Sequence, residues 1–232
     1  MTTPPQTNLL LDSLSPESRG RVLALAKELD LPLRTPLQDQ EESPRYCYFL
    51  TSGMASFVVT LPEGGSAEVM VAGREGMTDP FSLLGPARSP ARCFIQVPAS
   101  GFRVPFEKLY KLFRESEEIR DRMLQLVQQQ GLTMAQIAAC NKLHDSEARL
   151  ARWLLMVQDR IDQDVLPLTQ EFLAQMLGAQ RTTVAVAAGT LQRSGFIDYK
   201  RGKVKILARP ELEDAACDCY PVTRRLLRNL YQ

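Results

Sequence analysis

Residues 168–207 read LTQEFLAQMLGAQRTTVAVAAGTLQRSGFIDYKRGKVKIL, a pattern that indicates two short helices followed by a hairpin. Thr169 is a suitable N-terminal cap for the first helix, and Gly178 supplies the permissive backbone at its end. Ala174, four residues before Gly178, is small enough for two helices to approach closely, and Val184, six residues after it, fills the crossing. The stretch therefore predicts a helix-turn-helix.

The second helix is predicted to run from about residue 180 to residue 194. A helix that enters a major groove reads base edges with the residues of its first turns. We therefore expect four polar side chains at its start to face the bases: Gln180, Arg181, Thr182 and Thr183.

Apolar and polar residues alternate from Ile197 to Ile206, which predicts two strands around a turn at Arg201–Gly202. Their apolar face would pack on the helices and leave a basic tip free, so the hairpin has the form of a wing. We expect three residues of this tip to touch phosphates: Lys200, Arg201 and Lys203.

The chain has 232 residues, of which 44% are hydrophobic. That length suits two modest domains, and that composition supports a buried core.

Positive charge is concentrated in the helix-turn-helix and hairpin. Between Leu168 and Arg209, seven basic and two acidic residues leave a local charge of +5, in a chain whose total is +1. Contact with a phosphate backbone requires such a basic module.

The sequence favours a cytoplasmic protein with no membrane partner. No segment approaches the roughly 18 apolar residues that a membrane helix needs, and the N-terminus lacks a secretion signal. The cysteines are odd in number and mostly far apart, which fits reduced thiols better than a disulfide framework. They are Cys47, Cys93, Cys140, Cys217 and Cys219.

The N-terminal part begins with a predicted helix and continues with strands. Ser15 and Pro16 are start signals, and apolar residues at helical spacing extend the predicted helix to Leu29. Short β-prone runs separated by turn residues then indicate a β-sandwich or barrel. These runs are 46–50, 55–61, 67–72, 93–97 and 102–106.

A long helical region is predicted from Phe106 to about His144, with room for one break. An apolar seam with steps of four and three follows it, as in a helix that faces a partner helix. We expect the seam to mediate dimerisation through Ile119, Met123, Leu126, Gln130, Thr133 and Ile137. The alternative is a helix packed on its own domain, and the polar Gln130 and Thr133 weaken the coiled-coil interpretation.

Asp145 or Ser146 caps a further predicted helix with an apolar face, and the polar segment IDQDVLP follows it. We therefore expect three parts: a β-rich domain over 1–112, a long helix and hinge over 113–144, and a DNA-binding domain over 145–232.

The order of these parts resembles the cyclic-AMP receptor and fumarate-nitrate-reductase (Crp–Fnr) family of bacterial regulators. The segments that carry the resemblance are 168–197 with YKRGKVKIL, GREGM (73–77), RLARWLL (149–155) and LEDAACDCY (212–220). The resemblance implies an α+β protein with an N-terminal jelly-roll barrel like that of cyclic-nucleotide-binding domains, a long dimerisation helix and a C-terminal winged helix-turn-helix. It also implies a homodimer that binds an inverted repeat in double-stranded DNA and contacts RNA polymerase.

In the family, an arginine early in the recognition helix reads guanine, and Arg181 matches its position. The acidic residue that usually follows is Thr182 here, and the later arginine is Val186. Direct readout is therefore expected to depend strongly on Arg181, and the family's operator sequence cannot be transferred.

Cyclic AMP is not the expected effector. Family members hold its phosphate with a Gly-Glu pair and an Arg-Ser pair, but Asp79-Pro80 stands at the first place and Ala91-Arg92 at the second. An aspartate aimed at a phosphate would repel it. For an unidentified effector, the residues assigned from the resemblance are Gly76, Met77, Arg88, Arg92, Gln130 and Thr133.

No metal, cofactor or catalytic centre is expected. The family's iron–sulfur sensors use an N-terminal cysteine cluster, and this chain has no cysteine before Cys47. Cys217 and Cys219 would need further ligands, and Cys140 and His144 are spaced one helical turn apart; taken as isolated pairs, they read as packing residues or surface thiols. His144 is the single histidine, so any catalytic centre of the Ser-His-Asp or Cys-His type would have to include it.

Two functions remain open on the sequence. The favoured one is a DNA-binding dimer with an unidentified effector. The alternative is a signalling module that binds a small molecule or protein and uses its helix-turn-helix for protein contact.

Overall fold

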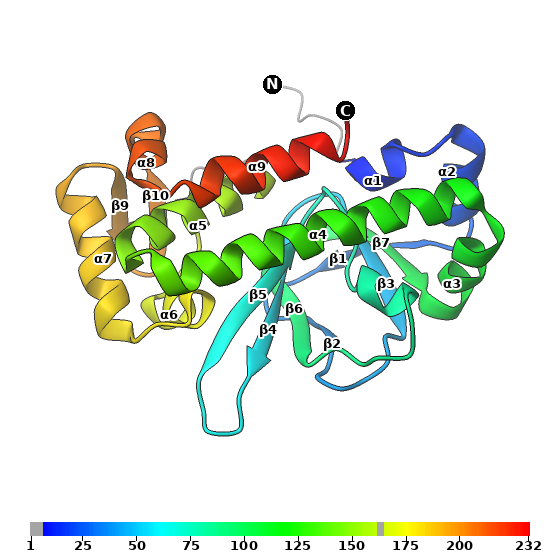
Figure 1. Ribbon diagram of the computed structural model, residues 1–232, viewed down its shortest axis with the longest axis horizontal. Coiled ribbons are helices and arrows are strands. Elements are labelled where there is room, and N and C mark those ends of the chain that lie inside the picture. The colour runs from blue at the N-terminus through cyan, green and yellow to red at the C-terminus, as the bar shows by residue number, and fades with distance from the viewer. Residues whose placement is uncertain (1–6, 162–164) are drawn as a thin grey trace. The chain divides into compact units, whose positions relative to one another are not determined.

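A computed structural model describes residues 7–161 and 165–232, and Figure 1 follows its elements in chain order. The chain divides into two compact units. The N-terminal unit comprises Met1–Phe57, Met70–Gly131 and Leu227–Gln232, and the C-terminal unit comprises Val58–Val69 and Leu132–Leu226.

Two short helices open the N-terminal unit, α1 (Leu9–Asp12) and α2 (Pro16–Leu23). The predicted start signals act as expected: the Ser15 hydroxyl accepts a hydrogen bond from the Ser18 amide at 3.3 Å, and Pro16 is the first helical residue. The proline ring suits this position because the amide it removes has no partner within the helix.

The prediction that this helix continues to Leu29 is wrong. The chain leaves the helix after Leu23 and forms strand β1 (Lys27–Leu31), in which Leu29 lies opposite Gly101. Pairing with a neighbouring strand therefore outweighs the helical spacing of these apolar residues, because spacing alone does not include the hydrogen bonds that a sheet edge offers.

The strands of the N-terminal part form two sheets, with orders β1-β7-β3 and β2-β6-β4-β5. Their bounds are β2 (Pro36–Gln38), β3 (Tyr46–Leu50), β4 (Met54–Thr60), β5 (Ser66–Ala72), β6 (Ala91–Val97) and β7 (Ala99–Pro105), with a short 3-10 helix, η1 (Pro80–Leu83), before β6. Five of these strands match the five predicted segments to within three residues at each end. The sequence analysis missed β1 and β2, which are short or largely exposed.

The predicted long helical region is present and has one break. It consists of α3 (Phe106–Glu115) and α4 (Glu117–Leu143), separated by Ser116 in an extended conformation. Both helices supply the core of the N-terminal unit, where Leu109, Ile119 and Leu126 are fully buried beside Phe49 and Met77.

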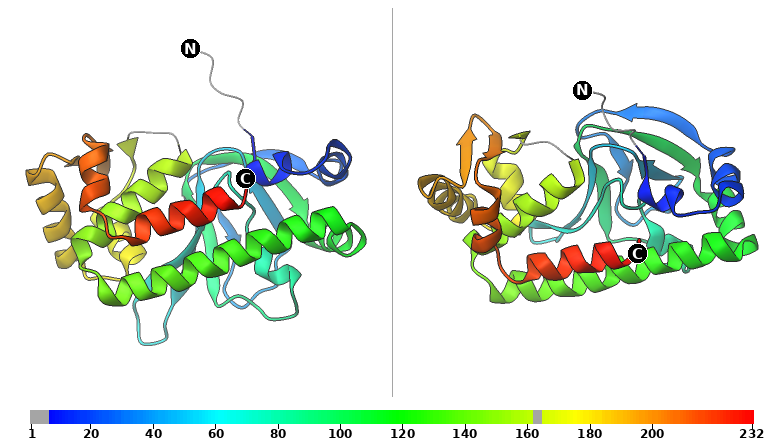
Figure 2. Two further views of the ribbon diagram at one scale, coloured as in Figure 1. Left: turned by 45° about the horizontal axis from the view of Figure 1, so that its top comes forward. Right: turned by 90° about the horizontal axis from the view of Figure 1, so that it is seen from above.

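The C-terminal unit contains the last part of α4 and the remaining elements, except for the last three residues of α9. They are α5 (Ser146–Ile161), β8 (Val165–Leu166), α6 (Gln170–Leu177), α7 (Arg181–Arg193), β9 (Ile197–Lys200), β10 (Lys203–Ile206), α8 (Arg209–Ala215) and α9 (Cys219–Asn229). A small sheet has the order β8-β10-β9. Figure 2 shows that α9 begins beside the last turns of α4.

Three residues of the predicted polar linker, 162–164, lie outside the described residues, and the next two form β8. The predicted fold class is confirmed: a sheet-rich N-terminal part, a long helix and a helix-turn-helix with a hairpin. Within the described ranges, none of the helices is long and apolar enough to cross a membrane.

Candidate nucleic-acid interface

Helices α6 and α7 are joined by residues 178–180, a turn as short as a helix-turn-helix requires. The Thr169 hydroxyl caps α6 by accepting a hydrogen bond from the Phe172 amide at 3.2 Å. Gly178 ends α6 with a φ of 57°, a left-handed conformation that costs glycine little. Both local signals act at the positions that the sequence indicated.

Ala174 and Val184, which the sequence analysis assigned to the crossing of the two helices, are buried, with 7% and 0% of their surface exposed. Arg149 on α5 adds a link that sequence analysis missed: its side chain is buried and donates a hydrogen bond from Nη2 to the Leu177 carbonyl. The last carbonyls of a helix have no partner within it, and a cation there is also favoured by the helix dipole. α5 therefore fixes the end of α6 before the turn.

All eight side chains that the sequence analysis assigned to DNA contact are exposed on the C-terminal unit. They are Gln180, Arg181, Thr182, Thr183, Val186, Lys200, Arg201 and Lys203. On the same helix α7, Val184, Ala187 and Leu191 are buried. The helix thus turns its apolar face inward, and its first two turns remain available to a ligand.

An open groove of about 510 Å³ lies beside the residues of α7 that the sequence assigned to DNA contact. Thr182, Thr183 and Val186 line it on α7, and Asp145 and Glu147 line it at the start of α5. Sequence analysis missed this acidic rim, because the two helices are far apart in the chain. Carboxylates repel phosphates, so a DNA backbone that met α7 would be disfavoured on the side of this rim.

The hairpin of β9 and β10 is antiparallel, with Lys200 opposite Lys203 and Ile197 opposite Ile206. Its two-residue turn has positive φ angles at both positions, 50° at Arg201 and 73° at Gly202. Such a turn matches the right-handed twist of a hairpin. Sequence analysis missed β8, which pairs with the other edge of β10 and gives the wing a third strand.

Some of the positive side chains of this region are paired with acidic groups, and others are exposed. The Lys200 ammonium lies 3.2 Å from an Asp198 carboxylate oxygen, and Arg209 is engaged in a polar network. Arg181, Arg201 and Lys203 remain exposed. The charge available to a phosphate backbone therefore lies at the start of α7 and at the tip of the wing.

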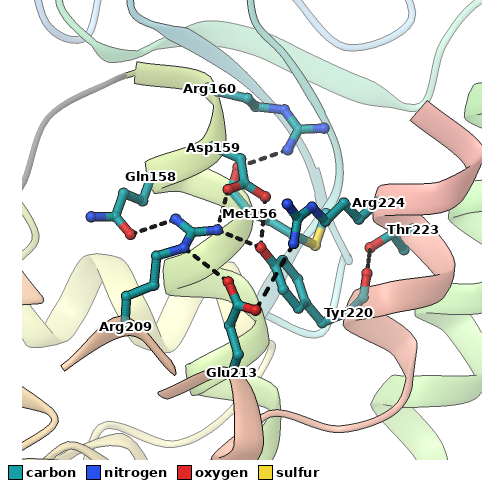
Figure 3. A network of polar contacts seen from close by, with 9 residues as sticks. All are labelled: Met156, Gln158, Asp159, Arg160, Arg209, Glu213, Tyr220, Thr223 and Arg224. Carbon is teal, nitrogen blue, oxygen red and sulfur yellow. Dashed lines mark hydrogen bonds and ion pairs between the residues drawn. The ribbon is translucent and has the colours of Figure 1, made fainter. Parts of the chain in front are cut away.

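Figure 3 shows the polar network that holds α8 and α9 against α5. The Arg209 guanidinium donates to Gln158 at 2.7 Å, to Asp159 at 2.6 Å and to Glu213 at 2.8 Å. The Tyr220 hydroxyl, at the start of α9, accepts from Arg209 and donates to Asp159 at 2.9 Å. One guanidinium thus connects three helices of the C-terminal unit.

The residues assigned to an effector site have unlike surroundings within the N-terminal unit. Gly76 and Met77 are buried, and a side chain at Gly76 would stand 3.0 Å from Leu126. Arg88 and Arg92 are exposed: Arg88 donates to the Glu41 carbonyl at 3.3 Å, and Arg92 lies 5.4 Å from the centre of the Phe94 ring. The surroundings of the two arginines thus differ from those of the buried pair.

Two further residues of that assignment lie on α4. Gln130 is buried, and its Oε1 has no hydrogen-bond partner among the described residues, whereas Thr133 is half-buried. A buried amide oxygen without a partner costs free energy, so Gln130 is a position where a ligand or water would be favoured.

Asp79 does not point a free carboxylate at a ligand. It is 3% exposed, and its Oδ2 accepts a hydrogen bond from the Ser82 hydroxyl at 2.6 Å. Burial raises the pKa of this carboxyl above its usual value. The Asp79 carboxyl group is therefore buried and engaged with Ser82.

The predicted dimer seam faces the interior of the chain at its first residues. Ile119, Met123 and Leu126 are 0%, 2% and 0% exposed and belong to the core of the N-terminal unit. Ile137, farther along, is half-buried. Their spacing thus identified a buried face of α4, whose first residues pack in the core of the N-terminal unit.

Four side chains that the sequence presented as two separate pairs meet in the C-terminal unit. Cys140, His144, Cys217 and Cys219 each place one ligating atom within 4.8 Å of the others. The Cys140 and Cys217 sulfur atoms share a hydrogen bond at 3.4 Å, which raises the pKa of Cys140 and lowers that of Cys217. No local sequence signal joins the pairs, since more than seventy residues separate them.

Comparison with protein-family models yields a match over residues 148–215. This segment is a Crp-like helix-turn-helix domain. The Crp-like domain includes α5, the helix-turn-helix, the wing and α8. A comparison with curated proteins finds no matching relative.

Solved structures share the fold over most of the chain. A protein described as a Crp/Fnr-family transcriptional regulator from Eubacterium rectale is 15% identical, with a TM-score of 0.71 over 89% of this chain and 96% of that one. CLP, a c-di-GMP responsive global regulator from Xanthomonas campestris, is 16% identical, with a TM-score of 0.67 over 83% and 99%. A CRP-family regulator from Thermus thermophilus is 20% identical, with a TM-score of 0.68 over 81% and 96%. The predicted resemblance to Crp–Fnr regulators is confirmed, and at these identities the likeness concerns the fold.

Proposed function

We propose that the protein is a homodimeric transcription regulator that recognises an inverted repeat in double-stranded DNA through α7 and the wing. The observation that carries the proposal is that every residue assigned to DNA contact lies on the exposed side of a Crp-like helix-turn-helix. In this proposal residues 1–112 act as a sensor, 113–144 as the dimerisation helix and hinge, and 145–232 as the DNA-binding domain.

Base readout would come from the first two turns of α7. Arg181 is exposed and free to present two parallel donors to guanine, the commonest specific contact in a major groove. Val186 is 68% exposed on the second turn of α7, so its side chain is accessible to a partner. A thymine methyl group is a suitable partner for it.

Phosphate contact would come from the tip of the wing. Arg201 and Lys203 are exposed, whereas the Lys200 charge is partly compensated by Asp198. These contacts position the protein without reading the sequence, and they make affinity depend on salt.

The exposed side of α4 would supply the dimer contact. Leu124, Leu132 and Leu143 are 39%, 50% and 76% exposed on this helix, on the side away from the buried Ile119 and Leu126. In the proposed dimer, these leucines would be covered by the second copy. A two-fold dimer would place two copies of α7 about one DNA turn, roughly 34 Å, apart.

The proposal also includes an effector other than cyclic AMP and a contact with RNA polymerase. The c-di-GMP named for the Xanthomonas regulator shows that effectors other than cyclic AMP occur on this fold, and the burial of Asp79 argues against a cyclic-AMP phosphate site here. A regulator of this kind would contact RNA polymerase when bound upstream of a promoter.

Selection from random DNA duplexes, followed by sequencing, tests the proposal. The full-length protein should enrich an inverted repeat, and Arg181→Ala, whose side chain is exposed and makes no core contact, should lose enrichment while remaining folded. A folded protein that enriches no sequence would overturn the proposal and favour a helix-turn-helix used for protein contact.

A further inference from the structure

The end of α4 and the corner between α8 and α9 together form a cluster of sulfur and nitrogen ligands. Cys140 lies in the last turn of α4, and His144 follows directly after the helix. The four-residue spacing places their side chains on the same side of the helix end. Cys217 and Cys219 flank Asp218 just before and at the start of α9. We call these four residues the Cys3His cluster: Cys140, His144, Cys217 and Cys219.

The Cys3His cluster has the dimensions of a single tetrahedral metal site. Two of its separations are 3.4 Å between the sulfur atoms of Cys140 and Cys217, and 3.6 Å between the Cys219 sulfur and His144 Nδ1. All four ligand atoms lie within 4.8 Å of one another. With metal–sulfur bonds of about 2.3 Å and a metal–nitrogen bond of about 2.0 Å, tetrahedral edges are about 3.5–3.8 Å.

Two other uses of cysteine fit these distances less well. A disulfide requires sulfur atoms about 2.05 Å apart and would leave Cys219 and His144 unused. An iron–sulfur cluster places several irons and sulfides between its ligands, so its cysteines stand farther apart than in a site for one ion. The geometry therefore favours one ion held by four protein ligands.

The surroundings of the Cys3His cluster suit thiolates. The Gln136 amide donates to the Cys219 sulfur at 3.1 Å, and the Cys219 backbone N–H donates to the Cys217 sulfur. Donors of this kind orient metal-bound thiolates and tune their charge. Cys140, Cys217 and Cys219 are buried with Ala148 as their partly buried apolar neighbour, whereas His144 is half-buried at the edge of the cluster.

Arg152 supplies an independent indication of a buried anionic group nearby. Its guanidinium is 2% exposed, its Nη1 contacts the Met156 sulfur at 3.1 Å, and its Nε has no hydrogen-bond partner among the described residues. It interacts electrostatically with both Cys140 and Cys217. A divalent ion with three thiolates and a neutral imidazole carries one net negative charge, which would compensate this buried cation.

We propose that Cys140, His144, Cys217 and Cys219 bind one Zn²⁺ ion. Thiolate and imidazole ligands in a tetrahedral arrangement select zinc among the common biological divalent ions. Four protein ligands leave no open position, so the ion is structural: it clamps the end of α4 to the corner from which α9 starts. Neither the Crp-like helix-turn-helix match nor the DNA-binding proposal assigns this site.

The first experiment measures metal in the full-length protein, purified without a histidine tag and under reducing conditions. Elemental analysis should give about one zinc per chain, as expected for a closed four-ligand site. After chelation, titration with Co²⁺ should produce the thiolate charge-transfer and visible bands of tetrahedral cobalt, and Zn²⁺ should displace them.

Variants locate the ion. Cys217→Ser and His144→Ala should weaken Co²⁺ binding by more than about tenfold. Cys47→Ala and Cys93→Ala remove buried cysteines of the N-terminal unit and serve as matched controls, with full metal content. Because a cysteine variant can fail to fold, His144→Cys provides a conservative test: a four-thiolate site should keep the ion and intensify the charge-transfer bands.

Three results would overturn the proposal. One is metal-free protein that shows no tetrahedral Co²⁺ spectrum on titration. Another is iron with acid-labile sulfide in stoichiometric amounts. The third is a Cys140–Cys217 disulfide, detected by peptide mass mapping, in protein that binds no metal when reduced. None of these readouts involves DNA, so they are independent of the proposed function.

Discussion

Arg181 and Arg201 both carry exposed guanidinium groups, but their backbones differ. Arg181 is the first residue of α7, whereas Arg201 occupies a left-handed turn with a φ of 50°. Helical backbone holds a side chain at a defined angle to a groove, which suits base readout. A hairpin tip is suited to a contact that requires charge alone. The two arginines therefore support different predictions.

Arg181→Ala is expected to weaken binding to the selected operator by about 1–3 kcal/mol and to relax discrimination at one base pair in each half-site. Binding to unrelated duplexes should change little. Fluorescence anisotropy with the operator and with single-base variants measures both effects. A uniform loss on all sequences would show that Arg181 contacts a phosphate instead.

Arg201→Asn should separate charge from turn geometry. Asparagine tolerates the left-handed conformation better than arginine, so the free energy of unfolding should rise by up to about 1 kcal/mol. Loss of the charge should lower affinity for all duplexes and reduce the salt slope by about one.

The matched control for Arg201→Asn is Lys203→Gln, which removes the same charge at a residue with ordinary strand geometry. It should reproduce the effect on DNA without the gain in stability. Urea denaturation and salt titrations measure the two quantities. An Arg201→Asn protein less stable than the parent would contradict the strain assigned to this turn.

The helices of the C-terminal unit are connected by polar groups as well as by apolar packing. Arg149 joins α5 to the end of α6, and Arg209 joins α5, α8 and α9 (Figure 3). Both act on the arrangement of helices around α7. Because Asp159 and Arg209 are partly exposed, with side-chain exposures of 24% and 34%, their contribution is smaller than that of a dry pair.

Arg209→Met keeps most of the side-chain length and removes its hydrogen bonds. It should lower the free energy of unfolding by about 1–2 kcal/mol, the range for hydrogen bonds to charged groups after solvent screening. Arg224→Met is the control, since Arg224 is 56% exposed and lies 3.9 Å from Glu213. It should change stability by less than about 0.5 kcal/mol. Equal losses in urea denaturation would contradict the role given to Arg209.

Substitutions on the exposed and buried faces of α4 are expected to have different effects on dimerisation and folding. Leu132→Glu, at an exposed position, should leave the fold intact and shift the protein from dimer to monomer in sedimentation velocity. Ile119→Glu should instead unfold the N-terminal unit, because it places an unpaired charge in a core. Leu84→Glu makes the same substitution at an exposed position outside α4 and should stay dimeric. A Leu132→Glu protein that remains dimeric would place the interface elsewhere.

Cyclic AMP is expected not to bind or to change DNA affinity. Asp79 is buried against Ser82, and Arg88 and Arg92 are exposed with other contacts, so the described residues show no assembled phosphate cradle at these positions. Calorimetry with millimolar cyclic AMP, paired with DNA-binding assays, checks the prediction. Micromolar binding accompanied by tighter operator binding would contradict it.

The helix-turn-helix could be predicted from the sequence because its signals are local. The Thr169 cap, the left-handed Gly178 and the alternation in the wing each act within a few residues of where they are read. The exposure of Arg181 and Val186 follows from the same helical period. Interactions of this kind depend on backbone geometry and change little with distant parts of the chain.

Three features depend on residues that are distant in the chain. Leu29 lies in a strand because β7 pairs with it, and Ile119 is covered by its own unit because a heptad pattern does not specify which surface covers it. Cys140 on α4 and Cys217 just before α9 meet although 77 residues separate them in the chain. Sequence patterns indicate which residues are buried. They do not indicate which residues or strands these side chains pack against, because the tertiary fold determines which surfaces come together.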